Sequence, residues 1–180
     1  MSFELMTRMR QAGRSVSFDP NLRPSLWASE QKMITEINRL AALAHWVLPG
    51  LSEGRLLTGF EDPADIAAFY LGQGAEAVAI KLGPHGAYYR THLDQGFVAG
   101  VPVQTVVDTV GAGDGFAVGM ISALLENHSF ADAVQRANWI GSRAVQSRGD
   151  MEGLPNRAEL LAELDAAIRE QARSHTGSAA

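Results

Sequence analysis

The 180-residue sequence contains no cysteine. Disulfide bonds, thiolate-bound zinc and a cysteine nucleophile are therefore excluded. The five histidines show no i,i+4 pair of the kind that binds a metal. Positive charge is scarce, because the chain has 15 Lys and Arg residues against 20 Asp and Glu residues. The formal net charge is −5. Such a chain lacks the basic surface that binds nucleic acid or anionic membranes, so we expect neither partner.

Long hydrophobic runs are also lacking. Gly, Asp or Arg interrupts each apolar stretch well short of the ~20 residues that a membrane span needs. The first ten residues carry mixed charge and lack the apolar segment of a signal peptide. We therefore expect a cytoplasmic protein. Hydrophobic residues make up 46% of the chain and charged residues 19%, which predicts one packed domain over residues 1–173 and a mobile tail over 174–180.

Helical and strand patterns alternate along the chain. Helices are expected at 3–11, 29–44, 52–57, from 62, and at 111–126, 130–147 and 157–173. Strands are expected at 15–19, 45–48, 77–82, 87–90, 96–99 and 101–107. This alternation predicts an α/β fold with a mainly parallel sheet covered on both faces. A lone helix before the first strand leaves that strand short of neighbours, which indicates that part of the sheet is absent from this chain.

A glycine-rich turn, Asp108-Thr-Val-Gly-Ala-Gly-Asp114, joins a predicted strand to a predicted helix. Glycine lets the backbone approach a ligand closely, and the first N–H groups of a helix attract anions. A carboxylate at Asp114 would repel a phosphate, but it suits a base that takes a proton from an attacking hydroxyl. The alternative is a capped helix after a glycine turn, with Asp114 favoured by the helix dipole.

Two other phosphate-binding motifs do not fit this turn. A dinucleotide-binding fingerprint would need glycine at Phe116. A Walker A loop needs Gly-x-x-x-x-Gly-Lys, and no such string occurs.

The pattern Asp-Thr-x-Gly-Ala-Gly-Asp resembles the signature of the PfkB family of carbohydrate kinases. The resemblance implies that Asp114 is the general base and that the backbone amides of Gly111, Ala112 and Gly113 form the anion hole for the transferred phosphoryl group. It also implies that Asp108 and Thr109 shape the turn, with Thr109 near the nucleotide.

Two further segments are similar to family motifs at strand ends. Asp19-Pro-Asn-Leu-Arg23 is similar to a motif of members that act on ketoses and keto-deoxy acids, and the resemblance places Arg23 over the phosphates. The alternative is a turn locked by Asp-Pro and Asn. Glu53 matches the Glu of an Asn-x-x-Glu pattern, which organises Mg²⁺ through water. Gly50 stands where that pattern has Asn, and Glu53 could instead complement a helix dipole.

The string Lys81-Leu-Gly-Pro-His-Gly86 resembles the nucleotide-side loop of the family. The resemblance assigns nucleotide binding to Lys81, Gly83, Gly86 and, on a later helix, Asn138. Without the resemblance, the loop is typical of a common hairpin turn, and Asn138 is typical of a solvated helix residue.

The resemblance covers residues 15–155 and implies a ribokinase-like three-layer α/β/α fold that lacks its N-terminal strands and lid. It implies an enzyme that uses ATP and Mg²⁺ to phosphorylate a sugar or keto-deoxy sugar acid. The strings Asp-Pro-Asn-Leu-Arg-Pro-Ser-Leu-Trp and Leu-Pro-Gly-Leu-Ser-Glu-Gly-Arg-Leu-Leu-Thr-Gly favour 2-keto-3-deoxygluconate, with fructose or another sugar second. Without the lid, we expect impaired activity and a homo-oligomer. A non-catalytic nucleotide-binding or oligomerising module is the alternative.

Overall fold

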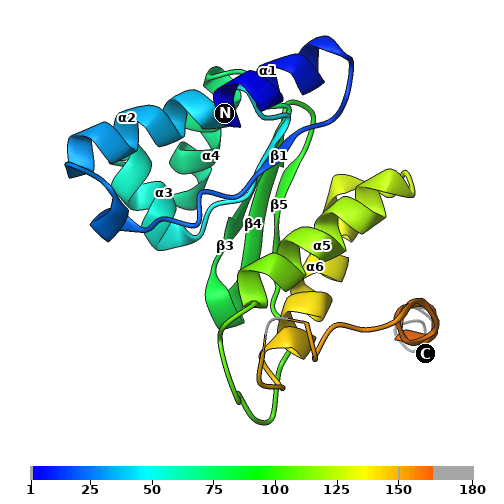
Figure 1. Cartoon of the computed structure of the whole chain (residues 1–180). Helices are drawn as coiled ribbons and strands as arrows, with labels where there is room; N and C mark the ends of the chain where they lie inside the picture. Colours follow the sequence, from blue (N-terminus) through cyan, green and yellow to red (C-terminus); the bar gives the residue numbers. More distant parts are fainter. Residues whose placement is uncertain (1, 150, 164–180) are drawn as a thin grey trace.

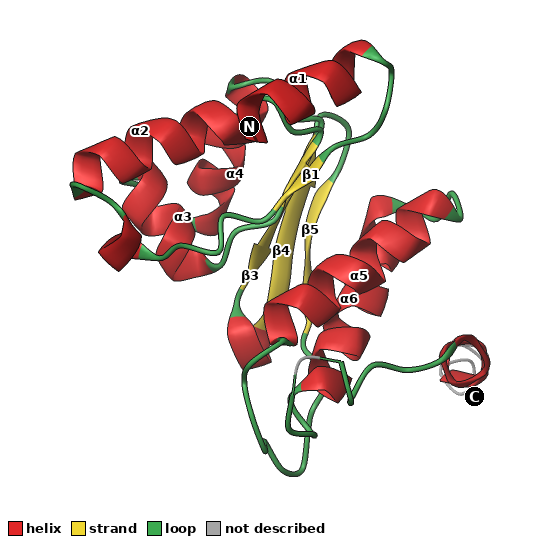
Figure 2. Ribbon diagram, viewed as in Figure 1, coloured by secondary structure: helices red, strands yellow, loops and turns green. Residues whose placement is uncertain are grey.

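The computed structural model describes residues 2–149 and 151–163. Its strands form one sheet (Figure 2). The strand order in this sheet is β1-β2-β3-β4-β5. The strands are β1 (Ser17–Phe18), β2 (Trp46–Val47), β3 (Ala77–Lys81), β4 (Gly86–Thr91) and β5 (Gln95–Ala99). The β1–β2 and β2–β3 pairs are parallel, whereas β3–β4 and β4–β5 are antiparallel. The sheet is therefore mixed, with parallel pairing confined to its first three strands.

Helices cover both faces of the sheet (Figure 1). One layer contains α1 (Ser2–Gln11), α2 (Glu30–Ala41), α3 (Leu51–Thr58) and α4 (Pro63–Gly72). The other contains α5 (Ala112–Leu125) and α6 (Phe130–Ala144). Short 3-10 helices occupy Pro24–Leu26 and Gly83–His85. This arrangement confirms the expected α/β/α layering.

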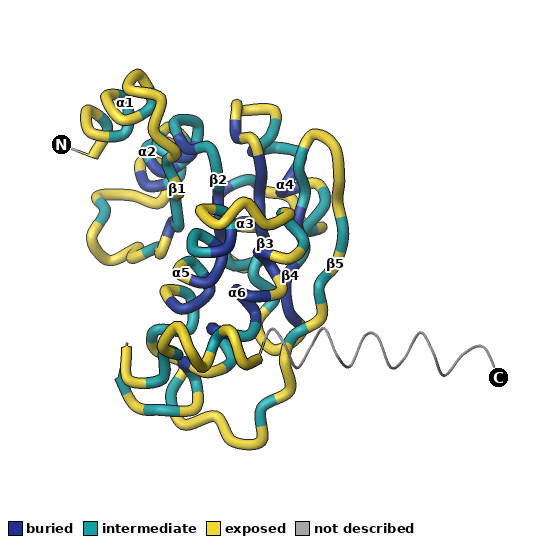
Figure 3. Tube along the Cα trace, turned by 90° about the vertical axis from the view of Figure 1, so that its right-hand side faces the viewer, coloured by how far each residue is buried: buried dark blue, intermediate teal, exposed yellow. Residues whose placement is uncertain are grey.

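The central strand β3 divides its side chains between the two layers. Val78 and Ile80 pack in the cluster that includes Ile66 and Tyr70 of α4. Ala79 packs instead with the side chains of α5 and α6. Successive residues of a strand point to opposite faces, so a short apolar run supplies both cores. Figure 3 shows burial concentrated along these inner strands.

The pairing of α5 with α6 depends on small residues. A Cβ added to Gly119 would lie 2.8 Å from the Cα of Ala137, closer than real contacts allow. The two helices therefore pack backbone against backbone. This close contact fixes the start of α5 relative to the last turns of α6, where the pocket described below lies.

Residues 101–107 do not form the predicted strand. β5 ends at Ala99, and the chain then leaves the sheet with no partner strand beside it among the described residues. A strand needs a hydrogen-bonded neighbour, and alternating apolar residues alone do not supply one. The segment instead runs to α5 as an irregular connection that is mostly exposed.

The last predicted helix is present over the residues that are described, 157–163. Its predicted continuation to 173 and the predicted mobile tail at 174–180 lie outside the described residues. Within the described part of the chain, none of the helices combines the length and hydropathy that crossing a membrane requires.

Candidate active site

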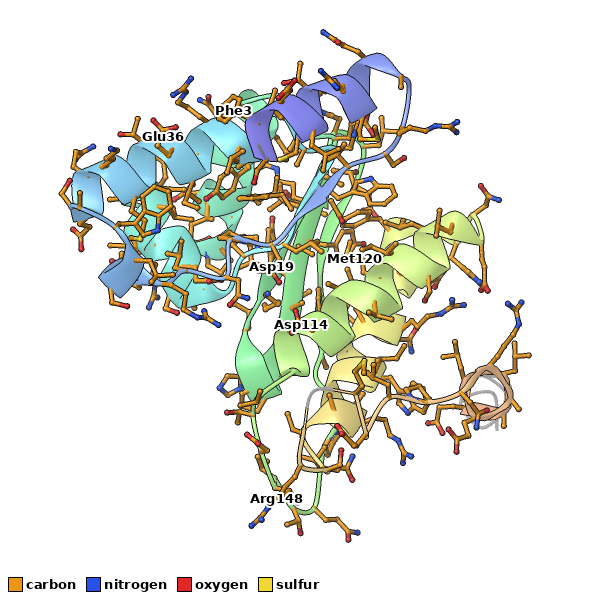
Figure 4. All side chains as sticks on the ribbon, in the orientation of Figure 1. Phe3, Asp19, Glu36, Asp114, Met120 and Arg148 are labelled. Carbon is orange, nitrogen blue, oxygen red and sulfur yellow. The ribbon has the colours of Figure 1, made fainter. Side chains whose placement is uncertain are left out.

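The carboxyl ends of the three parallel strands meet at one edge of the sheet, beside the start of α5. Asp19 follows β1, Gly50 follows β2 and forms a bridge with Lys81, and Lys81 ends β3. Figure 4 labels Asp19 at this edge and Asp114 next to it at the beginning of α5. Ligands of open α/β sheets bind at this kind of edge, so the strand ends define the candidate site.

The glycine-rich turn has the geometry of an anion site. Gly111 is the N-cap of α5 and has a φ of +79°, a left-handed conformation that favours glycine. Upstream, Oδ1 of Asp108 accepts a hydrogen bond of 3.0 Å from the N–H of Val110 and so shapes the turn. The first N–H groups of α5 are free of intrahelical acceptors, as at every helix start. Asp114 lies in this first turn and its side chain is exposed.

A pocket of about 720 Å³ lies beside this turn, between the Gly83–Gly86 loop, the end of β5 and the last turns of α6. Its lining is largely apolar, from residues such as Val103, Val106 and Val145. The structure brings to it the following predicted site residues: Lys81, Gly83, Gly86, Thr109, Ala112, Gly113 and Asn138. An apolar cavity with a few polar groups and an anion site at one end matches the shape and chemistry of a nucleotide.

Two of these residues, Asn138 and Gly86, also stabilise the local backbone structure. Asn138 is buried, and its Nδ2 donates hydrogen bonds of 3.1 Å to the carbonyls of Val98 and Ala99. Asn138 therefore holds the end of β5 in place at the pocket wall. A Cβ on Gly86 would lie 2.1 Å from the Val98 carbonyl oxygen, so glycine is required there by backbone packing. In contrast, Gly83 has a φ of +60° and open space beside it.

Arg23 and Glu53 lie near the edge but are engaged locally. The Arg23 guanidinium is exposed and donates to Asn21 Oδ1 at 2.6 Å and to the Leu22 carbonyl at 3.0 Å. Glu53 accepts 2.8 Å hydrogen bonds from the N–H of Leu22 on Oε1 and from the N–H of Gly50 on Oε2. Glu53 thus ties the loop after β1 to the start of α3.

The residues present suit an indirectly held Mg²⁺ better than a direct cage. No group of three or more His, Cys, Asp or Glu within residues 2–149 and 151–163 could enclose a metal. Mg²⁺ commonly keeps several waters and binds one or two carboxylates plus the phosphates of a substrate. Glu53 is the carboxylate at this edge that fits such an outer role.

One feature of the site had no signal in the local sequence. Lys81 Nζ forms an ion pair with Asp19 Oδ2 across 62 residues of chain. Lys81 was predicted as a nucleotide ligand and Asp19 only as part of a motif. The position of both residues at the carboxyl ends of parallel strands is the pattern that could have paired them.

Comparison with known proteins agrees with this geometry. The model of the pfkB family carbohydrate kinases matches residues 1–157. The chain is 54% identical over 165 residues to 2-dehydro-3-deoxygluconokinase of Bacillus subtilis, covering 92% of this chain and 51% of that protein. The chain thus spans about half the length of this relative.

Solved structures show the same relationship. A PfkB protein from Polaromonas sp. JS666 superposes with a TM-score of 0.80 and 54% identity, over 89% of this chain and 50% of that one. Fructokinase from Vibrio cholerae, solved with fructose, ADP and a calcium ion, gives a TM-score of 0.82 and 33% identity, over 89% of this chain and 54% of that one. The glycine-rich turn, the layered sheet and these matches together show that the chain belongs to the pfkB family of carbohydrate kinases.

Proposed function

We propose that this chain carries the nucleotide-binding and phosphoryl-transfer part of a kinase that uses ATP to phosphorylate a hydroxyl of 2-keto-3-deoxygluconate. The observation that carries the proposal is the Gly111–Asp114 turn, which opens α5 at the end of an apolar pocket of about 720 Å³. The pocket suits an adenosine group, and the helix start suits the phosphates that extend from it.

The residues have complementary roles in this proposal. The N–H groups of the turn bind the oxygens of the transferred phosphoryl group. Asp114 accepts the proton of the attacking hydroxyl while that oxygen bonds to the γ-phosphorus and the bond to the ADP oxygen breaks. Mg²⁺, when bound with the nucleotide, would neutralise phosphate charge, with Glu53 in an outer role. An ATP-dependent reaction of this kind favours the cytoplasm, which stays a prediction.

The choice of sugar acid is supported by the 54% identity to 2-dehydro-3-deoxygluconokinase, whose name refers to the same sugar acid. Similarity to fructokinase is lower, at 33% identity for the Vibrio cholerae structure. Asp114 is exposed in this chain, although phosphoryl transfer depends on positioning and on exclusion of water. We therefore expect low turnover from the 180-residue chain by itself.

The second candidate is a non-catalytic nucleotide-binding or oligomerising module. The engagement of Arg23 with its own loop, and of Glu53 with a backbone N–H group of the loop after β1, favours it. Both candidates bind ATP, so binding alone does not separate them. A measurable transfer of phosphate to a sugar does.

The test is ADP formation from Mg·ATP with 2-keto-3-deoxygluconate, fructose and ribose, for the wild type and Asp114→Asn. We expect the highest rate with the keto-deoxy acid and a rate ~10²–10⁴-fold lower in Asp114→Asn, because a general base contributes about that factor. ATP binding should persist in the variant. Asp65→Asn, on the exposed start of α4, is the matched control.

Three other outcomes would contradict parts of this proposal. A higher rate with fructose would reject the sugar acid as substrate. ATP binding with no sugar-dependent ADP formation would support the module. An unchanged rate in Asp114→Asn would reject this residue as the base.

A further inference from the structure

The ion pair between Lys81 and Asp19 lies where the sheet edge meets the start of α5. Lys81 ends β3 and Asp19 follows β1, and the side chains are 18% and 21% exposed. The pair is therefore mostly screened from solvent at a site where ligands of this class of sheet bind.

The pair lies directly against the predicted anion hole. A Cβ added to Gly113 would lie 3.4 Å from Lys81 Nζ and 3.9 Å from Asp19 Oδ2. The ammonium group thus faces the backbone of the first turn of α5, and Lys81 also lines the pocket. Arg23, the cation predicted to lie over the phosphates, is bonded to its own loop.

The energetics of the pair argue against a purely structural purpose. Oδ1 of Asp19 is buried and has no hydrogen-bond partner within the described residues. Burial raises the pKa of Asp19 above its ordinary value, against the opposing effect of Lys81. A buried ion pair with an unsatisfied oxygen adds little to stability. Glu53, nearby, shows the contrasting structural case, since both of its oxygens accept backbone N–H groups.

We propose that Lys81 is the catalytic cation that contacts the transferred phosphoryl group, and that Asp19 is the positioning residue that holds Lys81 against the Gly111–Gly113 turn. This inference rests on the proposed kinase function and extends it. The lysine stem is flexible, and a fixed carboxylate restricts where its charge can go. The ammonium stabilises negative charge that spreads over the phosphoryl oxygens.

The test measures binding by calorimetry on the 180-residue chain with Mg·ATP and with AMP. AMP has the base, ribose and first phosphate but lacks the group that Lys81 would contact. We expect Lys81→Met to weaken Mg·ATP binding ~10- to 100-fold, the size of a lost hydrogen bond to a charged group. AMP binding should change by no more than about twofold. Lys81→Arg should restore part of the loss.

Asp19→Asn separates positioning from a direct role. Asp19→Asn should also weaken Mg·ATP binding, as Lys81→Met does. The double variant should bind Mg·ATP no more weakly than Lys81→Met alone, because Asp19 acts through Lys81. Lys32→Met and Asp65→Asn make the same charge changes on exposed helix starts and should leave both affinities unchanged. Thermal melts by circular dichroism identify any variant that does not fold.

Equal losses of ATP and AMP affinity in Lys81→Met would overturn the inference, and so would losses that multiply in the double variant. If Asp19→Asn does not fold, the ratio of ATP to AMP loss in Lys81→Met decides alone. If the wild type binds Mg·ATP but the expected differences between the variants are not seen, only the inference is rejected and the proposed function stands. A wild type that does not bind Mg·ATP would reject the proposed function together with the inference.

Discussion

At the scale of single residues, the site depends on backbone geometry as much as on side chains. Gly111 adopts a φ of +79°, and the next two residues, Ala112 and Gly113, begin α5 and line the pocket. Gly113 lies beside the Lys81 ammonium, because a Cβ at this position would be in van der Waals contact with Lys81 Nζ at 3.4 Å. Asp114 then adds the one exposed carboxylate of this first turn. A substitution at Gly111 should therefore damage both folding and binding.

We predict that Gly111→Ala lowers the free energy of unfolding by ~1–2 kcal/mol, the cost of a left-handed conformation for a residue with a Cβ. Mg·ATP affinity should also fall, because the strain disturbs the amides that bind phosphate. Urea denaturation and calorimetry measure the two effects.

Gly13→Ala is the control for this prediction. Gly13 has a φ of +67° with no neighbouring atom within 4 Å of an added Cβ, at the end of α1. It should lose similar stability and keep its ATP affinity. Equal losses of affinity in both variants would contradict the special role of Gly111.

At the scale of elements, local sequence signals predicted some boundaries and failed at others. Ser29 caps α2 by accepting a hydrogen bond from the N–H of Lys32, and Asp62 with Pro63 begins α4, as their sequences predict. The strand predicted at 101–107 is wrong because pairing depends on a neighbour that no local pattern reveals. The ion pair of Asp19 with Lys81 escaped prediction for the same reason, since only the strand order brings the two together.

The turn between α5 and α6 holds an ion cluster that stabilises this helix pair. Glu126 Oε2 lies 2.9 Å from Arg136 Nη1, and Arg136 is 3% exposed. The hydrogen bond and the charge of Arg136 lower the pKa of Glu126 below its ordinary value of 4.5. A carboxyl with a lowered folded-state pKa stabilises the fold above its ordinary pKa, and this stabilisation disappears as the pH falls through the lowered value.

We predict that Glu126→Gln lowers the melting temperature at pH 7 and that the gap to the wild type closes as the pH falls below 4.5. Melting curves of both proteins between pH 3 and about 7 would measure this difference in melting temperature. A gap that stays constant over this range would contradict the assignment of the stabilisation to the Glu126 charge.

At the scale of the whole molecule, one side is poorly covered. Among the described residues, β1 pairs with β2 alone, and Figure 3 shows β1, α1 and α5 on the side opposite β5. Leu5 of α1 is 57% exposed, and Val118 and Leu125 of α5 are 50% and 72% exposed. An open strand edge beside exposed apolar residues favours association with another chain.

We predict that the purified chain forms a dimer or larger species by size exclusion with light scattering, and that Val118→Lys shifts it toward the monomer. Leu93→Lys is the matched control, because Leu93 is 98% exposed in the β4–β5 turn, away from β1. A wild-type monomer would contradict this prediction.

The proposed binding of ATP depends on the pocket between the glycine-rich turn and α6. Ser142 of α6 lines it, whereas Gln146, just beyond the same helix, does not. A tryptophan at 142 would fill space that a nucleotide needs, and a tryptophan at 146 would extend into solvent.

Calorimetric titration of Mg·ATP into the wild type, Ser142→Trp and Gln146→Trp is the most direct test. We expect saturable binding to the wild type and to Gln146→Trp, with an affinity at least ~10-fold lower for a folded Ser142→Trp. No binding to the wild type, or equal affinity in all three proteins, would contradict this expectation.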